Sequence, residues 1–264
     1  MYTRYLLFIL LIVFGLVGCS KYRDFEQVKL KNGVMLDKKS SQPYTGSILV
    51  RYENNQPKRE MQYRDGLPDG IWQIWYQSGQ LKKEIYYRDG NKEGPTTFWY
   101  EDGLKKEEGR YGHGKKTGVW TKWYPNGVKK EEKNFKNGIR DGLYAQWHEN
   151  GEVFSQQEFD AGELNGVSVH KYNNGQIQSE VTFRDGVEQG TVTEYYKNGQ
   201  KRSEGTFRNG ILDGTMTYWY SNGQKQQEID YENGNRAGHW RYWYEDGTLL
   251  FDTPFKKNTL SQAN

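Results

Sequence analysis

The sequence predicts an all-β protein in which tandem antiparallel β-hairpins form one elongated twisted sheet or solenoid. Glycine recurs every 24 residues without insertion or deletion, and short Gly-containing turns separate runs rich in aromatic and β-branched residues. A short unit that repeats in this way stacks on its neighbours. The repeat glycines are Gly46, Gly70, Gly94, Gly118, Gly142, Gly166, Gly190, Gly214 and Gly238.

The segment from Gly70 to Glu93 shows what one unit builds. Its two apolar runs are separated by a short turn, which is the signal for a hairpin. This first turn recurs as Asn126-Gly127, and a second turn closes each unit, as at Asp65-Gly66. Asx-Gly pairs accept the positive φ that tight turns need. Most of the 31 glycines are therefore interpreted as turn residues.

Large aromatic residues occupy fixed positions in the repeat. The first strand ends in a pair such as Trp75-Tyr76, and the second strand carries an aromatic residue seventeen positions after the repeat glycine, from Tyr63 to Phe255. We expect these rings to stack between hairpins, because neighbouring strands lie about 4.8 Å apart. Trp75 and Tyr76 should point to opposite faces, so that one face packs inward and the other stays available.

A glutamate also recurs at one position, as at Glu84, Glu108 and Glu132, with lysines shortly before it. We expect cross-strand ion pairs between these groups, each worth about 0.2–1 kcal/mol. Several equivalent copies indicate a structural role, because a catalytic carboxylate would occur once.

The N-terminal segment has the features of a lipoprotein leader. Arg4 precedes an apolar run from Leu6 to Val17, which is too short for a comfortable membrane span but right for a signal peptide. The run ends at Leu16-Val17-Gly18-Cys19, which resembles the bacterial lipobox, in which the cysteine thiol receives a lipid. Cys19 is the single cysteine of the chain. The following residue, Ser20, favours the outer membrane of a Gram-negative bacterium by the same resemblance.

These features divide the chain into four segments. Residues 1–18 are the predicted signal peptide, and residues 19–45 are a lipidated tether and N-terminal cap that includes a hairpin between Val28–Leu30 and Val34–Leu36. Residues 46–255 hold nine repeats, and residues 256–264 form a polar C-terminal tail.

The assembled motif resembles the MORN-variant repeat family. The pattern Gly-x-Trp-x-x-Trp-Tyr-x-x-Gly followed by Lys-x-Glu-x-x-Tyr-x-x-Gly stands nearly intact from Gly70 to Gly90, and the resemblance runs from about Tyr44 to Phe255. It implies consecutive antiparallel hairpins in a long twisted sheet. Bacterial members with a lipobox are often grouped with the antitoxins of toxin–antitoxin systems. The units that begin at Gly142 and Gly166 depart most from the pattern.

The residue pattern gives little support to catalysis, and we predict that the protein is not an enzyme. The four histidines, His113, His148, His170 and His239, fall at different positions of the repeat, and no metal spacing or nucleophile motif is present. We therefore expect no metal and no cofactor. A net charge of +3 is too small to indicate nucleic-acid binding.

The leading hypothesis is a membrane-anchored, non-catalytic protein-interaction scaffold in the cell envelope. Trp75, Trp99, Trp123, Trp219 and Trp243 are the candidate contact residues, since Trp is enriched at recognition surfaces. Two alternatives stay open. One is an antitoxin or immunity role against an envelope-acting toxin, and the other is binding of cell-wall glycan by stacking of sugar rings on the aromatic residues.

Overall fold

The computed structural model describes residues 22–255, and most of these residues form β-strands. The N-terminal strands are β1 (Tyr22–Asp24), β2 (Val28–Lys31) and β3 (Val34–Asp37), with a 3₁₀ turn, η1 (Phe25–Gln27), between the first two. The repeat strands are β4 (Gly46–Arg51), β5 (Pro57–Arg64), β6 (Leu67–Trp75), β7 (Leu81–Arg88), β8 (Asn91–Trp99), β9 (Lys105–Gly112), β10 (Lys115–Trp123), β11 (Lys129–Lys136), β12 (Ile139–Trp147), β13 (Val153–Asp160), β14 (Glu163–Leu164), β15 (Gly166–Lys171), β16 (Ile177–Arg184), β17 (Val187–Tyr195), β18 (Lys201–Arg208), β19 (Ile211–Leu212), β20 (Gly214–Trp219), β21 (Lys225–Glu232), β22 (Asn235–Trp243) and β23 (Leu249–Pro254).

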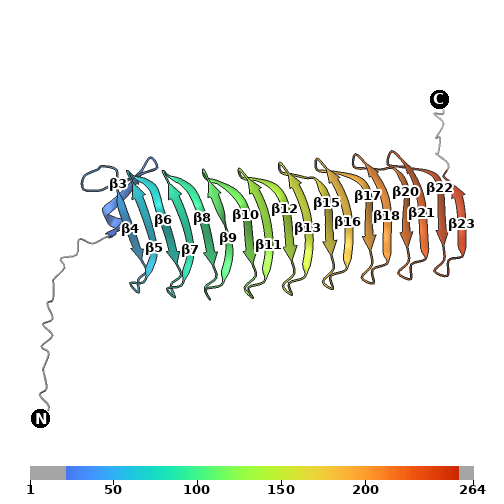
Figure 1. The fold of residues 1–264 in the computed structure, drawn as a ribbon, viewed down its shortest axis with the longest axis horizontal. Helices are drawn as coiled ribbons and strands as arrows, with labels where there is room; N and C mark the ends of the chain where they lie inside the picture. The colour runs from blue at the N-terminus through green and yellow to red at the C-terminus, as the bar shows by residue number, and fades with distance from the viewer. Residues whose placement is uncertain (1–21, 256–264) are drawn as a thin grey trace, which may run out of the picture.

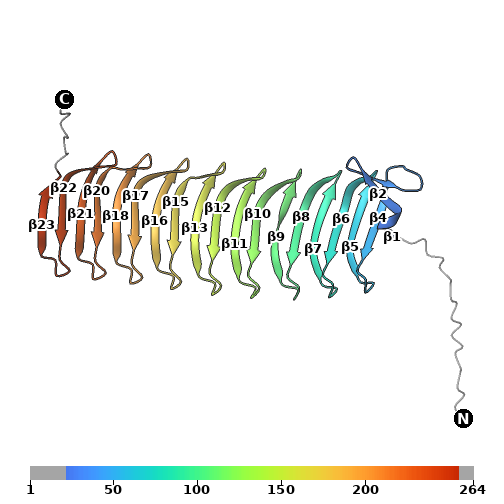
Figure 2. The same ribbon diagram turned by 180° about the vertical axis from the view of Figure 1, so that it is seen from behind.

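The repeat strands follow one another side by side in chain order, each antiparallel to the last (Figure 1). The short β1 joins the N-terminal edge in parallel with β4, which makes the 21-stranded sheet mixed. Two first strands are interrupted, so that β14 and β15 both pair with β13, and β19 and β20 both pair with β18. The expected hairpin stack is confirmed. Figure 2 shows the same single layer from behind.

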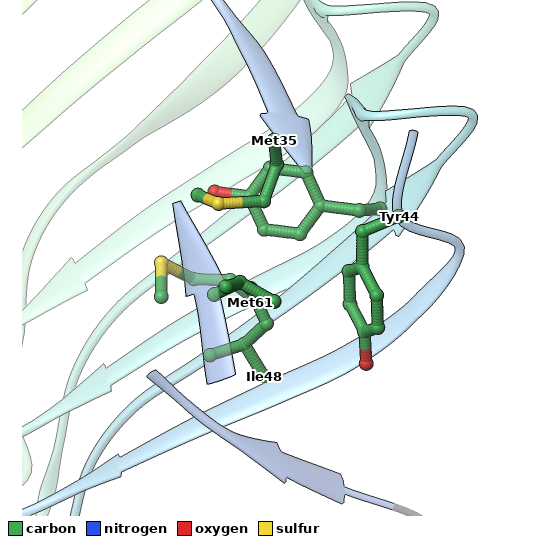
Figure 3. Packing of buried hydrophobic residues seen from close by; sticks show 6 residues of the cluster. Met35, Tyr44, Ile48 and Met61 are labelled. Atoms are coloured by element: carbon green, nitrogen blue, oxygen red, sulfur yellow. The ribbon is translucent and has the colours of Figure 1, made fainter. Parts of the chain in front are cut away.

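The N-terminal cap covers the start of the sheet. Strands β2 and β3 form the expected hairpin, with Val28 paired to Asp37 and Lys31 to Val34. Met35 from the cap joins Ile48, Met61 and neighbouring rings in the main hydrophobic cluster (Figure 3). The cluster stands at the end of an otherwise one-layer ribbon because a terminal repeat needs its exposed flank covered.

The repeat glycines correct one expectation, because they lie within strands rather than in turns. All nine have positive φ, for example +107° at Gly70 in β6. Met61 pairs with Trp72 and Tyr63 with Pro68, so a step of two residues along β5 meets a step of four along β6. A β-bulge of this kind bends a strand and favours glycine. The 24-residue period therefore marks a bend in every first strand.

The two turns of each unit differ in backbone geometry. At the second turn both residues have positive φ, as at Asp65 (+48°) and Gly66 (+78°), which is a type I′ turn. At the first turn the positive φ falls on glycine, as at Gly127 (+82°), and the Gly127 N–H donates to the Tyr124 carbonyl at 3.0 Å. The first turn of each unit is therefore a type I turn that ends in a glycine with left-handed backbone conformation.

The sheet has two distinct faces, which we call the cap face and the open face. The cap face carries the residues of the hydrophobic cluster and, farther along, Ile85, Trp120 and Ile229. Alternation along a strand places Trp75 on the opposite side from Trp72, and this opposite side is the open face. No helix of residues 22–255 has the length and apolar character needed to cross a bilayer.

Ring stacking holds the cap face together beyond the cap. The centroids of Trp72 and Tyr87 are 4.6 Å apart, and Trp120 lies 5.0 Å from Tyr111 and 6.5 Å from Phe135. The Trp72–Tyr87 and Trp120–Phe135 contacts join the two strands of one hairpin, whereas the Tyr111–Trp120 contact joins successive hairpins edge to face. The expected ring contact between hairpins is therefore found at Tyr111. Each ring on the second strand pairs with a repeat glycine, as Tyr87 does with Gly70.

Candidate interaction surface

The five candidate tryptophans form a row on the open face. Each is the last residue of its first strand, and each side chain is half-buried. Equivalent positions of adjacent repeats are two strands apart, which corresponds to about 10 Å. Trp147 stands in the same row, whereas Lys171 and Tyr195 take the equivalent positions in two later repeats.

A lysine from the preceding repeat covers several of these rings. The ammonium of Lys105 lies 5.8 Å from the centroid of the Trp123 ring, and that of Lys225 lies 5.8 Å from Trp243. Lys129 covers Trp147 at 5.5 Å, and Lys201 covers Trp219 at 5.6 Å. Cation–π contacts of this kind at partly exposed sites are worth about 0.5–1 kcal/mol.

The covering lysines are themselves held by glutamates, but not across strands as expected. Lys105 pairs with Glu108 at 2.6 Å and Lys129 with Glu132 at 2.7 Å, three residues along the same strand. Residues three apart normally face opposite sides of a sheet. In the register of β10 against β11, Lys122 lies opposite Glu131 and Trp123 lies opposite Lys129, so β11 holds one extra residue between Lys129 and Glu131. This bulge brings the side chains of Lys129 and Glu132 to the same side of the sheet.

Trp75 and Trp99 differ from the other candidates. The position that supplies the covering lysine holds Pro57 in one case and Leu81 in the other. No ammonium from that position reaches their rings. The first two tryptophans of the row therefore present indole surface without the cation cover found at Trp123.

A row of exposed apolar side chains crosses the same face nearer the second turns. Val119, Leu143 and Val167 occupy one position in three successive repeats and are 48%, 44% and 53% exposed. Each lies four residues before the tryptophan position of its own strand, on the same face. The open face thus carries two parallel rows, of which the second is largely uncovered.

The tyrosines of the aromatic pair have a role that sequence reasoning missed. Each hydroxyl donates to a backbone carbonyl 23 residues later, as from Tyr76 to Trp99 (2.9 Å) and from Tyr196 to Trp219 (2.8 Å). We call this series the tyrosine ladder. It comprises Tyr52, Tyr76, Tyr100, Tyr124, Tyr172, Tyr196 and Tyr220.

The ladder has one gap, at His148. The buried His148 Nε2 atom has no hydrogen-bond partner within the described chain, and the carbonyl that the series would use belongs to Lys171. Each of the four ladder tyrosines before the gap is covered by the lysine six residues later, as Lys130 covers Tyr124 at 5.1 Å. At the gap Phe154 replaces that lysine and contacts His148 edge-on at 5.1 Å. The fixed spacing of tyrosine is the sequence signal that could have revealed the ladder.

Asparagine side chains reinforce the same edge. Asn198 Nδ2 donates to the Ser221 carbonyl at 2.7 Å, and Asn222 Nδ2 donates to Glu245 at 2.9 Å. The Oδ1 atom of the same residue accepts from the backbone two residues later, as in Asn222 to Gln224 at 2.9 Å. Asparagine therefore does more here than permit a turn.

A charged cluster lies on the cap face at the middle of the sheet. Glu131 accepts from Lys122 at 2.8 Å and from Lys133 at 2.9 Å. Burial favours the neutral acid, but these hydrogen bonds hold the pKa of Glu131 below its usual value. Burial and the nearby Glu131 raise the pKa of Tyr144 to about 12.

The neighbouring part of this cluster involves Lys116. Its ammonium lies 3.8 Å from the centroid of the Trp120 ring and 3.6 Å from Glu107. Burial lowers the pKa of Lys116 despite the carboxylate. The hollow lined by these groups has a volume of about 60 Å³, which is small for anything beyond water. Because its charges are paired internally, the cluster serves packing.

The histidines do not converge on one site. His113 is fully exposed, His148 fills the ladder gap, and His170 contacts Phe154. His239 Nδ1 lies 2.6 Å from Asp252 Oδ1. Among residues 22–255, no group of three or more His, Cys, Asp or Glu side chains could hold a metal ion. Cys19 and the predicted leader lie outside the described residues.

The family model described as MORN repeat variant matches six segments, residues 68–89, 116–137, 164–185, 188–209, 212–233 and 236–257. The chain belongs to the MORN repeat variant family. Each matched segment covers a first strand, the first turn and the following second strand, so the family pattern and the observed hairpins have the same period.

Other comparisons add little. No curated protein matches the chain. The TCP10 domain of Danio rerio CPAP, solved in complex with a peptide of Danio rerio STIL, is 18% identical over 86% of this chain and 98% of that one, with a TM-score of 0.33. A TM-score this low transfers nothing to the present chain.

Proposed function

We propose that this protein is a non-catalytic interaction scaffold, anchored in the cell envelope through a lipid on Cys19, whose open face binds a protein partner. The single observation that carries the proposal is the row of Val119, Leu143 and Val167, which is about half exposed on a face that no other element of residues 22–255 covers. Exposed apolar side chains that gather in one patch are typical of interaction sites.

The tryptophan row contributes unequally to this surface. Trp75 and Trp99 offer indole rings without a lysine above them, whereas Trp123, Trp219 and Trp243 are occupied by contacts within the sheet. We therefore assign binding to Trp75, Trp99 and the apolar row. The other three candidates are assigned to stabilisation of the repeat stack.

Affinity capture from solubilised envelopes tests the partner. A triple variant, Val119→Ser, Leu143→Ser and Val167→Ser, should no longer capture the partner that the unmodified protein retains. The few interface residues whose truncation costs more than about 1 kcal/mol cluster at the centre of the contact, where this row is placed by the proposal. Val187→Ser with Ile211→Ser is the matched control, since these apolar residues are 43% and 48% exposed at the second-turn edge. Equal capture by the triple variant would contradict the assignment of the open face.

The anchor has its own test. Cys19→Ala should move the protein from the membrane fraction to the soluble fraction, because acyl chains contribute about 0.8 kcal/mol per buried methylene. Unchanged fractionation would exclude lipidation at Cys19 as the anchor.

Toxin neutralisation and glycan binding stay predictions. A toxin gene beside this one would favour the first. Cosedimentation with peptidoglycan tests the second, and the lysine covers leave Trp75 and Trp99 as the rings on which a sugar could stack.

A further inference from the structure

The N-terminal cap carries exposed cations at the end of the molecule nearest the proposed anchor. Lys31, Lys38 and Lys39 are exposed, as is Lys29, whose ammonium lies 3.5 Å from the Ser41 hydroxyl. Within residues 22–43, the basic side chain that forms an ion pair is Arg23, which pairs with Asp37. The four lysines therefore have charge available for an outside partner.

An exposed apolar side chain stands among these lysines. Leu30 lies between Lys29 and Lys31 near the end of β2 and is 66% exposed, the highest value among the large exposed hydrophobic residues of the described chain. The exposed carboxylates of the cap both precede this hairpin in the sequence, because Asp24 comes before η1 and Glu26 lies within it. Alternation along β2 turns the Leu30 side chain to the other side of the strand from Lys29 and Lys31. The long lysine side chains can still extend their ammonium groups to the headgroup level beside a leucine that enters a membrane interface.

The length of chain before the cap limits how far it can lie from a bilayer. Cys19 precedes Tyr22, the first residue of β1, by three positions, and three extended residues span at most about 11 Å. The polar headgroup layer on one side of a bilayer is itself about 5–7 Å thick. A lipid on Cys19 would therefore keep β1 and the cap within reach of the headgroups.

We propose that the cap docks on an anionic phospholipid surface, with Leu30 entering the interface and Lys31, Lys38 and Lys39 contacting the lipid phosphates. The proposal rests on the lipid anchor of the proposed function. Each lysine near an anionic membrane surface raises the membrane-binding constant roughly fivefold. Docking at this end leaves the open face and the far strands β20 to β23 clear of the membrane (Figure 1).

The test uses the lipidated protein, in which acylation leaves Cys19 without a free thiol. A fluorescent label is attached through Gln27→Cys on the cap or Ser221→Cys at a distant first turn, both at exposed positions. The labelled proteins are reconstituted in vesicles of phosphatidylcholine with phosphatidylglycerol, or of phosphatidylcholine alone, with a headgroup quencher. We expect quenching at position 27 that is stronger in the anionic vesicles, and no such difference at position 221.

Charge variants separate docking from mere proximity. Replacing Lys31, Lys38 and Lys39 with glutamine should abolish the difference between the two vesicle types at position 27. Replacing the exposed Lys115, Lys136 and Lys197 with glutamine removes equal charge elsewhere and should preserve it. Equal quenching at position 27 in both vesicle types, or a loss with the distant variant too, would overturn the proposal. Failure of the protein to float with either vesicle would instead disprove the anchor, and the docking with it.

Discussion

Removing a single hydroxyl from the tyrosine ladder should measurably weaken the sheet. In Tyr196→Phe the ring stays, while the 2.8 Å hydrogen bond to the Trp219 carbonyl is lost. A hydrogen bond of this kind contributes about 0.5–1.5 kcal/mol. For a chain of this length, about 1 kcal/mol corresponds to a fall in melting temperature of about 2–4 °C.

Tyr244→Phe is the matched control for this substitution. Tyr244 occupies the same position in the last repeat, but it is 51% exposed and no following repeat supplies an acceptor within the described chain. Removal of the Tyr244 hydroxyl should leave the melting temperature within experimental error of that of the unmodified protein. Thermal unfolding followed by circular dichroism gives the comparison.

Hydrogen exchange adds a local measurement, because stacked repeats can open separately. The amides of β18 and β20 should exchange faster in Tyr196→Phe than in Tyr244→Phe. If the two variants melt and exchange alike, the ladder contributes no stability and the reasoning is refuted.

Three further substitutions or titrations test other parts of the structure. His148→Tyr should restore a hydroxyl opposite the Lys171 carbonyl and raise the melting temperature by about 2–4 °C, whereas a fall would show that the gap is packed around histidine. Gly127→Val should cost about 1–3 kcal/mol in urea unfolding, because φ is +82° and nothing lies within 4 Å to clash, so strain alone acts. Gly112→Ala, at a glycine without positive φ, should cost much less. The pKa of Tyr144 is raised from 10.0 to about 12, so its contribution to the free energy of unfolding should be complete below pH 10 and be lost as the pH rises to about 12. Ultraviolet titration of the phenol and unfolding at each pH measure this dependence. Phenolate formation near pH 10 would contradict it.

The repeat pattern was sufficient to predict the hairpins and their stacking. Asx-Gly pairs such as Asp65-Gly66 predicted the turns because few other residues accept positive φ there. Alternation along a strand is also the basis of the prediction that Trp75 and Tyr76 point to opposite faces. These features depend on local geometry, which neighbouring residues in the chain already define.

Features that depend on contacts between repeats were harder to predict. The position of Gly70 indicated a conformational requirement, but whether a turn or a mid-strand bulge required it depended on the register of β5 against β6. The cross-strand pairing expected for Glu132 was wrong for the same reason, since an extra residue near Lys129 turns the pair onto one side.

The sequence by itself determined the period, the strand order and the existence of an aromatic row along one face. Tertiary structure alone decided which of those rings are occupied by neighbouring lysines, which hydroxyls join successive repeats, and where the apolar surface stays uncovered. The physical reason is one of range. Turns and alternation are set within a few residues, whereas the cover over Trp123 comes from Lys105, eighteen residues earlier, and exists only after two hairpins have stacked in register.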